Sequence, residues 1–119
     1  MPVAKTHLLS GRSVDEKRAI GDAVQAALFD VLGIPNEWLF QVFAEYSEAN
    51  FAPNTEPTPS DQLVIEISLN EDEGGDDEEK KALLRAINAN LVATELVTTD
   101  DVFVIITEVG RASMGRGSG

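Results

Sequence analysis

Cysteine is absent from this 119-residue sequence, and histidine, tryptophan and tyrosine occur once each. Without a thiol the protein has no disulfide, no thiolate nucleophile and no cysteine-ligated metal. No apolar run is long enough to cross a bilayer, and the N-terminus lacks the charged and apolar regions of a signal peptide. These absences predict a cytoplasmic protein that does not enter a membrane.

Basic residues are also few, because nine Lys and Arg stand against 21 Asp and Glu, for a net charge of −12. Nucleic-acid binding needs a basic surface, so nucleic acid is not expected as a partner, and an anionic membrane surface is equally disfavoured. An anionic small molecule would have to be held by very few local cations. The length predicts one domain, residues 1–119, only just large enough for its own core.

The first half of the chain has the pattern strand, helix, strand. Val3–Leu9 is predicted to be a strand, and apolar residues then recur every three or four positions from residue 14 to about residue 32, which predicts a helix. Ser13 and Glu16 form a capping box at the start of that helix. Leu39–Ala44 is predicted to be a second strand, parallel to the first in one sheet.

The same pattern returns after a proline-rich stretch, residues 52–60, which we interpret as a linker. A strand over Leu63–Leu69, a helix from Glu78 to about Leu96 and a strand over Val102–Thr107 are predicted. Shifted by 63 positions, the two halves align without a gap, which indicates a tandem duplication of one βαβ motif. The repeats span about residues 2–51 and 63–114.

Each repeat is too small to bury its sheet alone. The predicted fold class is therefore α/β (α+β), with a four-stranded sheet and two helices on one face. The last strand is apolar without alternation over residues 103–106, and such strands are usually covered on both faces. Two helices cover only one face, so we expect oligomerisation with the sheets of several subunits facing inward.

Several short motifs carry a family resemblance. They are MPVAKTHLLSGRSVDEK, LGIP, FQVFAE and Asn50–Phe51 in the first repeat, and IITEVGRASMG in the second. Together they resemble the tautomerase superfamily, typified by 4-oxalocrotonate tautomerase, whose short members are one βαβ motif that starts with Pro and has a G-R-S/T turn. The double motif is similar to the malonate semialdehyde decarboxylase group and to macrophage migration inhibitory factor. The resemblance implies that fold, a homotrimer, and a reaction without cofactor or metal.

The resemblance also implies that Pro2 is the catalytic residue. Removal of Met1 would expose its secondary amine, and an α-amino group has a pKa of about 7.7–8.0, which an apolar surrounding lowers. Pro2 would then be neutral at physiological pH and could remove a proton next to a carbonyl and return it elsewhere. The alternative is a proline that merely begins an edge strand.

Four further residues are implied to bind substrate. Arg12 would hold a carboxylate with its planar guanidinium, the alternative being an ion pair with an acidic residue of the first helical turn. Phe51 would line an apolar floor near the proline, or simply pack in the core. Phe40 occupies the position at which the short tautomerases carry a second arginine. Trp38 lies near the position at which the decarboxylases carry an aspartate that helps to activate water. These two departures bear on the substrate rather than on the fold.

The second repeat lacks the chemical residues of the first. The alignment places Ile65 opposite Pro2 and Gly74–Gly75–Asp76 opposite the G-R-S turn, which predicts one active site per chain. Decarboxylase-like relatives carry two arginines after the third strand, where this chain has the acidic stretch Asn70–Glu79. Its carboxylates would repel a carboxylate substrate, so decarboxylation of a β-oxo acid is disfavoured.

A dicarboxylate substrate is disfavoured too, unless Arg111 or Arg116 from the C-terminal tail supplies a second cation. Within the acidic stretch, we interpret residues 76–79 as favourable charge at a helix N-terminus. The spacing of this stretch does not match a calcium-binding loop. The tail is rich in Gly and small residues, and is either flexible or crosses to a neighbouring subunit and helps to close a pocket.

The predicted function is a cofactor-independent keto–enol tautomerase acting on a small 2-oxo acid or related carbonyl acid, with Pro2 as general base. One alternative is the dehalogenase, hydratase or decarboxylase activity of the superfamily, which uses the same proline. Another is a non-catalytic oligomeric binding protein of this fold. His7, the only histidine, is interpreted as a strand residue rather than a catalyst.

Overall fold

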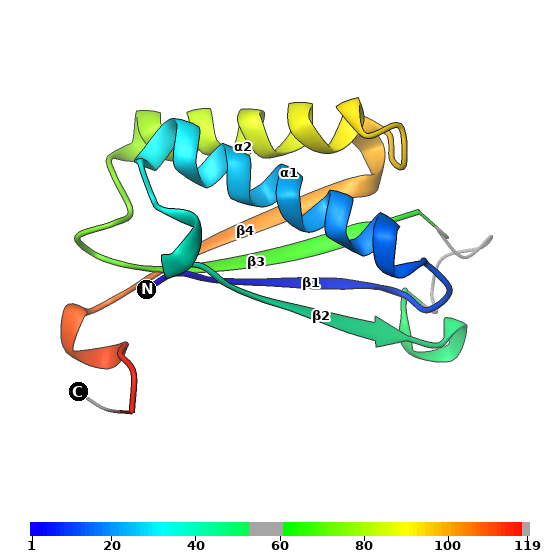
Figure 1. Ribbon diagram of the computed structural model, residues 1–119, viewed down its shortest axis with the longest axis horizontal. Helices are drawn as coiled ribbons and strands as arrows, with labels where there is room; N and C mark the ends of the chain where they lie inside the picture. Colours follow the sequence, from blue (N-terminus) through cyan, green and yellow to red (C-terminus); the bar gives the residue numbers. More distant parts are fainter. Residues whose placement is uncertain (53–60, 118–119) are drawn as a thin grey trace.

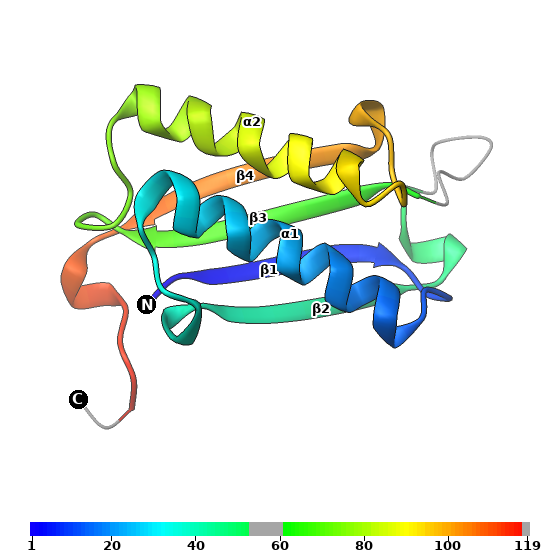
Figure 2. The same ribbon diagram turned by 45° about the horizontal axis from the view of Figure 1, so that its top comes forward.

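The computed structural model describes residues 1–52 and 61–117, so the predicted linker lies outside the described residues except for its first position. Two βαβ units form one sheet, and both helices lie on the same face of it (Figures 1 and 2). The first unit comprises β1 (Val3–Leu9), α1 (Val14–Leu32) and β2 (Phe40–Tyr46), and the second comprises β3 (Leu63–Asn70), α2 (Asp77–Ala93) and β4 (Val102–Val109). The predicted fold class is confirmed.

The strand order in the sheet is β2-β1-β3-β4. Within each unit the two strands are parallel, and the units meet through the antiparallel pair β1 and β3. The start of β1 therefore lies beside the end of β3, with Val3 opposite Ser68. This pairing also brings the N-terminus and the C-terminal tail to the same end of the sheet (Figure 1).

Local sequence signals explain where α1 begins and ends. The Ser13 hydroxyl accepts a hydrogen bond from the Glu16 backbone N–H at 3.1 Å, and the Glu16 carboxylate accepts one from the Ser13 N–H at 3.0 Å, which confirms the predicted capping box. Gly33 ends the helix in the left-handed conformation with φ of 69°, where a residue without Cβ is favoured.

The second helix is shorter than predicted. It was expected to continue to about Leu96, but α2 ends at Ala93. The Thr94 hydroxyl bonds to the Leu91 carbonyl, and Glu95 has a left-handed backbone with φ of 64°. The apolar spacing continues through this segment, but the positive φ of Glu95 breaks the helix.

The strand registers correct the alignment of the two repeats. Val3 pairs with Phe40, and Val64 pairs with Phe103. The two phenylalanines are 63 positions apart, whereas their partners are 61 apart. The loop between β3 and α2 is therefore two residues longer than the loop between β1 and α1.

This correction changes the residue that corresponds to Pro2. With a shift of 61, Pro2 corresponds to Leu63, the first residue of β3, and not to Ile65. The second repeat still has no proline at the head of its first strand. A sequence alignment had no means of placing the two extra residues, because the insertion lies in a loop without apolar periodicity.

The core lies between the sheet and the helices. Its largest fully buried side chains come from β1, α1, β3 and α2, and include Leu8, Ile20, Leu28, Ile65, Ile67, Leu83, Ile87 and Leu91. In the described residues, no helix is both long and apolar enough to span a bilayer.

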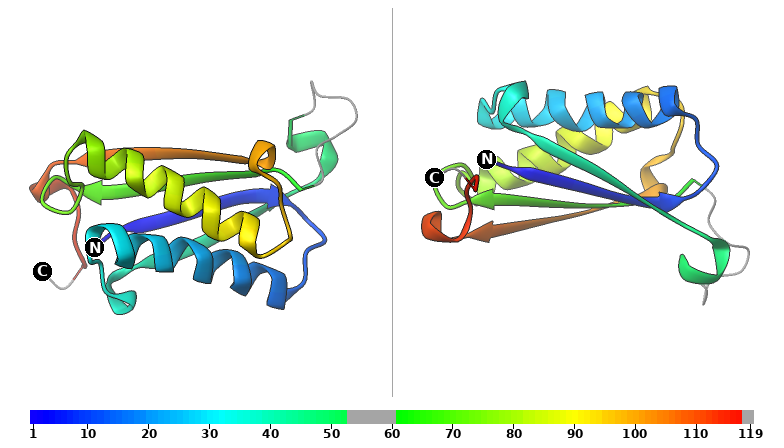
Figure 3. Two further views of the ribbon diagram at one scale, coloured as in Figure 1. Left: turned by 90° about the horizontal axis from the view of Figure 1, so that it is seen from above. Right: turned by 60° about the horizontal axis from the view of Figure 1, so that its bottom comes forward.

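The other face of the sheet carries no helix from the described residues (Figure 3). Phe43, Val104 and Ile106 pack against the core, so the alternating residues of β2 and β4 point away from the helices. These residues are large, apolar and exposed: Phe40, Val42, Phe103 and Ile105. The open face is thus an uncovered apolar surface of this chain.

Candidate active site

The predicted site residues lie at two opposite ends of the sheet. Pro2, Trp38 and Phe40 lie where β1 and β2 begin, whereas Arg12 and Phe51 follow the ends of these strands. β1 has seven residues, which is roughly 23 Å at the rise of a strand. Within one chain, therefore, Arg12 and Phe51 are not brought to Pro2.

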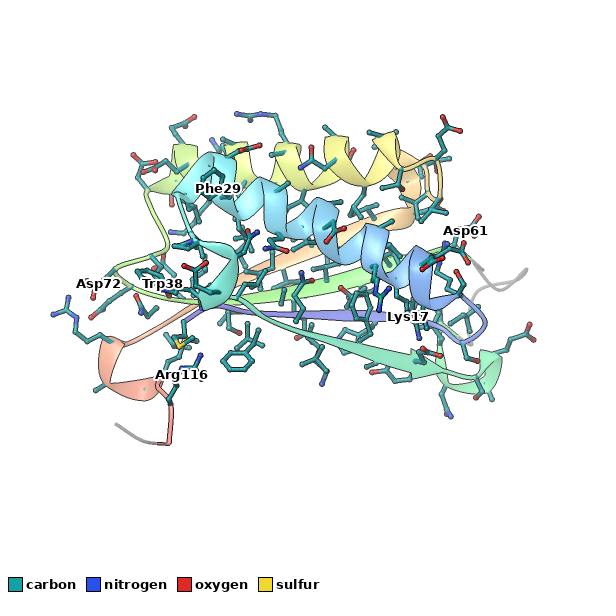
Figure 4. All side chains as sticks on the ribbon, viewed as in Figure 1. Lys17, Phe29, Trp38, Asp61, Asp72 and Arg116 are labelled. Carbon is teal, nitrogen blue, oxygen red and sulfur yellow. The ribbon has the colours of Figure 1, made fainter. Side chains whose placement is uncertain are left out.

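Figure 4 shows this separation in its labelled side chains. Trp38, Asp72 and Arg116 gather at the end of the sheet where the chain begins, and Lys17 and Asp61 lie at the other end. We call the first of these the N-terminal end of the sheet.

Pro2 is buried at the head of β1. Its carbonyl accepts a hydrogen bond from the Phe40 N–H at 3.0 Å, which holds it against the start of β2. Met1 precedes it, and the Met1 ammonium donates to Glu73 at 3.0 Å. While Met1 is present, the Pro2 nitrogen belongs to a peptide bond and has no basicity.

Two cavities adjoin Met1. The larger has a volume of about 650 Å³ and is lined by Met1, Glu37, Trp38, Asn70, Asp72, Glu73 and Arg116. The smaller has a volume of about 290 Å³ and is lined by Met1, Val3, Phe40, Met114, Gly115, Arg116 and Gly117. Met1 and Arg116 line both. Met1, which is bonded to the Pro2 nitrogen, therefore adjoins both cavities.

The loop after β3 directs one carboxylate toward the N-terminus. The Asn70 side-chain oxygen accepts hydrogen bonds from the Asp72 and Glu73 N–H groups at 2.9 and 3.1 Å. In return, the Glu73 carboxylate accepts one from the Asn70 N–H at 3.1 Å. This exchange fixes Glu73, whose side chain is 11% exposed, with its second oxygen on the Met1 ammonium.

The two tail arginines differ in how much of the guanidinium is engaged. Arg111 donates two hydrogen bonds to Asp72, at 2.9 and 2.6 Å, and Asp72 raises the pKa of Arg111 above its ordinary value. Arg116 lies over the Phe40 ring at 5.1 Å and donates from Nε to the Met1 sulfur at 3.1 Å. No carboxylate among the described residues lies within ion-pair distance of Arg116.

Arg12 is neutralised at the opposite end of the sheet. Its guanidinium contacts Glu16 at 3.3 Å and Asp61 at 3.2 Å, and it donates to the Leu96 carbonyl at 3.3 Å. Its side chain is 11% exposed. The structure thus contains the ion pair with the first helical turn that the sequence offered as the alternative to carboxylate binding.

Phe51 is buried in an aromatic stack. Its ring centroid lies 6.0 Å from that of Tyr46, which lies 5.7 Å from that of His7. The His7 ring nitrogens are 2.6 Å from the Tyr46 hydroxyl and 2.5 Å from the Glu66 carboxylate. In the described part of the chain, no three His, Asp or Glu side chains are arranged to hold a metal ion.

The approximate two-fold symmetry of the repeats relates these two ends. At one end Arg12, in the loop after β1, contacts Asp61 just before β3. At the other end Glu73, in the loop after β3, contacts Met1 just before β1. The loop after β1 therefore carries a positive charge, and the loop after β3 carries negative charge. Pro2 lies at the end of the sheet with the loop after β3.

Sequence reasoning missed Glu37 and Glu73. The predicted helix N-terminus at Asp76–Glu79 is confirmed, with Asp76 as the cap residue of α2. Glu73, earlier in the acidic stretch, contacts the Met1 ammonium instead. Glu37 lies in the short 3₁₀ turn Asn36–Trp38. A turn of this length has no periodic sequence pattern from which the residue could have been predicted.

Comparison with known proteins agrees with the fold and the repeat. A family model described as "Tautomerase enzyme" matches residues 2–58. The "Probable tautomerase YusQ" of Bacillus subtilis (strain 168) is 26% identical over 109 residues, covering 89% of this chain and 85% of that protein.

Two solved structures extend the match over nearly the whole chain. FG41 malonate semialdehyde decarboxylase inhibited by 3-bromopropiolate is 30% identical with a TM-score of 0.75, covering 97% of this chain and 90% of that one. A wild-type fused 4-OT asymmetric trimer is 24% identical with a TM-score of 0.85, covering 98% and 94%. The chain belongs to the tautomerase superfamily, as the motifs of its first repeat indicated.

Proposed function

We propose that this protein is a cofactor-independent keto–enol tautomerase acting on a small 2-oxo acid or related carbonyl acid. Pro2 is its general base after removal of Met1. The observation that carries the proposal is the position of Pro2, which is buried and directly follows Met1, a residue that lines both cavities. Membership in the tautomerase superfamily supports the same assignment.

The reaction needs only a proton transfer. The neutral Pro2 nitrogen removes a proton from C3 of the 2-oxo acid, and the electron pair of that C–H bond forms the C2–C3 double bond of the enol. The carbonyl π electrons move to the oxygen, and the protonated Pro2 amine gives the proton to that oxygen, so the neutral amine is regenerated and atoms and charge balance. Phe40 and Trp38 supply apolar surface at this end of the sheet.

Two variants test the role of Pro2. Conversion of enol to keto phenylpyruvate, followed by ultraviolet absorbance, should fall about 100-fold in Pro2→Ala, the scale expected for loss of a general base. A protein with an uncleaved N-terminal extension has no free amine on Pro2 and should lose the same activity. Intact mass measurement confirms that Met1 is absent from the wild type. Equal activity in all three proteins would refute the proposal.

A second candidate function follows from Glu73. The Glu73 carboxylate accepts a hydrogen bond from the N-terminal ammonium, and the Glu37 carboxylate lines the same cavity. Together they would suit an enzyme in which the amine donates a proton and a carboxylate activates water, as in hydratase, dehalogenase or decarboxylase chemistry. The pH profile separates the two candidates, because base catalysis is lost as pH falls and acid catalysis as pH rises.

We also propose that the chain assembles as a homotrimer. The apolar open face needs a cover, and the edge strands β2 and β4 have one unpaired side each in this chain. Arg12 and Phe51 could act only toward the Pro2 of another copy.

We treat residues 1–119 as one domain, because one core unites both repeats. A protein that assembles but has no catalytic activity would be the oligomeric binding protein.

A further inference from the structure

We infer that Arg116, in the C-terminal tail, holds the carboxylate of the substrate at the Pro2 site, and that the substrate carries only one carboxylate. This inference rests on the proposed function, since it names the residue that positions a 2-oxo acid against Pro2. It also selects Arg116 from the two tail arginines that the sequence offered as a cation for a substrate carboxylate.

Charge and contacts select Arg116. Among the described residues that line the two cavities, it is the only Lys or Arg. Phe40 supports one face of the guanidinium by a cation–π contact, which leaves the edge that carries the N–H donors available to a carboxylate. Arg12 and Arg111, by contrast, are bound to carboxylates of this chain.

Arg116 also lies beside the residue that precedes Pro2. In a 2-oxo acid the carboxylate carbon is two bonds from C3, so its anchor must lie within a few ångströms of the base. Arg116 touches the Met1 side chain, and Met1 is bonded to the Pro2 nitrogen. When Met1 is removed, the Nε–H of Arg116 loses its sulfur partner and faces the space beside that nitrogen.

The rest of the larger cavity excludes a second carboxylate. Glu37, Asp72 and Glu73 line it, and Trp38 is its only aromatic lining residue. A dicarboxylate held by Arg116 would place its far carboxylate against the charges of Glu37 and Glu73, in a cavity lined by no other Lys or Arg among the described residues. The far end of the substrate is therefore uncharged or cationic.

Binding without turnover tests the anchor. Benzoylformate is a 2-oxo acid with no hydrogen on the carbon next to its ketone, so it cannot enolise. Trp38, the only tryptophan, lines the same cavity and reports binding by its fluorescence. We expect Arg116→Gln to raise the Kd of benzoylformate at least about tenfold, the scale of a charge-assisted hydrogen bond. Arg116→Lys should restore part of the affinity.

Matched controls isolate the guanidinium. Arg85→Gln makes the same charge change on the exposed surface of α2 and should leave the Kd unchanged. The uncharged methyl ester of benzoylformate should bind wild type and Arg116→Gln alike. The inference is overturned if Arg116→Gln binds benzoylformate as the wild type does, if ester and acid lose affinity equally, or if the wild type does not bind the acid.

Turnover separates this inference from the proposed function. Arg116→Gln should raise the KM for phenylpyruvate with little change in kcat, and the wild type should prefer phenylpyruvate to the dicarboxylate 2-hydroxymuconate in kcat/KM. Pro2→Ala should lose turnover yet bind benzoylformate normally. If Pro2→Ala keeps full turnover, the proposed function fails, while the binding measurement still decides the role of Arg116. A preference for the dicarboxylate would overturn the single-carboxylate inference.

Discussion

Thr6 is a polar side chain in the middle of an apolar core. It lies on the helix-facing side of β1 and is 1% exposed. Its hydroxyl oxygen has no hydrogen-bond partner among the described residues. A buried polar group without a partner costs about 1–3 kcal/mol of folding free energy.

We predict that Thr6→Val raises the free energy of unfolding by about 1 kcal/mol, because valine keeps the shape and removes the unpaired hydroxyl. Urea unfolding at one fixed protein concentration measures the change, and the fixed concentration removes any contribution from assembly. Thr6→Ser keeps the hydroxyl and loses the methyl group, so it should instead destabilise the protein. A lower stability for Thr6→Val would show that the hydroxyl has a partner.

At the scale of a single element, the capping box at the N-terminus of α1 includes a charged side chain, that of Glu16. The Ser13 backbone N–H donates to the Glu16 carboxylate, and this hydrogen bond is the main cause that lowers the pKa of Glu16 below its ordinary value of 4.5, with a further contribution from Arg12. A lowered pKa in the folded state means that the charged form stabilises the fold.

We predict that this stabilisation depends on pH. It should be fully present above the ordinary glutamate pKa and should be lost as pH falls through the lowered value. Glu16→Gln keeps an oxygen acceptor for the Ser13 N–H but has no charge. The difference in unfolding free energy between wild type and Glu16→Gln should therefore be constant near neutral pH and shrink below about pH 4.5. A difference that does not change with pH would contradict this account.

At the scale of the whole molecule, the proposed trimer would bury the open face of the sheet. It carries two exposed apolar side chains on each edge strand, including Phe103 at 58% exposure. Phe29 on the outer surface of α1 is exposed to a similar degree, 56%, and lies on the opposite side of the molecule (Figure 4). The two phenylalanines therefore differ chiefly in the face they occupy.

We predict that sedimentation of the wild type gives about three times the 12.8 kDa mass of the chain, and that Phe103→Glu shifts it toward the monomer. A charge buried between apolar faces is costly, whereas Phe29→Glu on the helix side should leave the trimer intact. A monomeric wild type, or a trimer that tolerates Phe103→Glu, would refute assembly through the open face.

The sequence by itself determined the elements and the family. Apolar spacing, the Ser13–Glu16 cap and the turn residues are local signals, so the predicted bounds of β1 and α1 match the structure and those of the other strands differ by at most two residues. The motif around Pro2 and the repeat of βαβ units were enough to indicate the superfamily. These features depend on residues close together in the chain.

Only the tertiary structure decided which residues surround Pro2. The antiparallel pairing of β1 with β3 turns the second repeat around, so that Arg12 lies at the far end of the sheet and Glu73 reaches the N-terminus. Arg116 contacts Met1 across 115 positions of sequence. No local pattern encodes such a contact, because it arises only when strand order and register are set by packing over the whole chain.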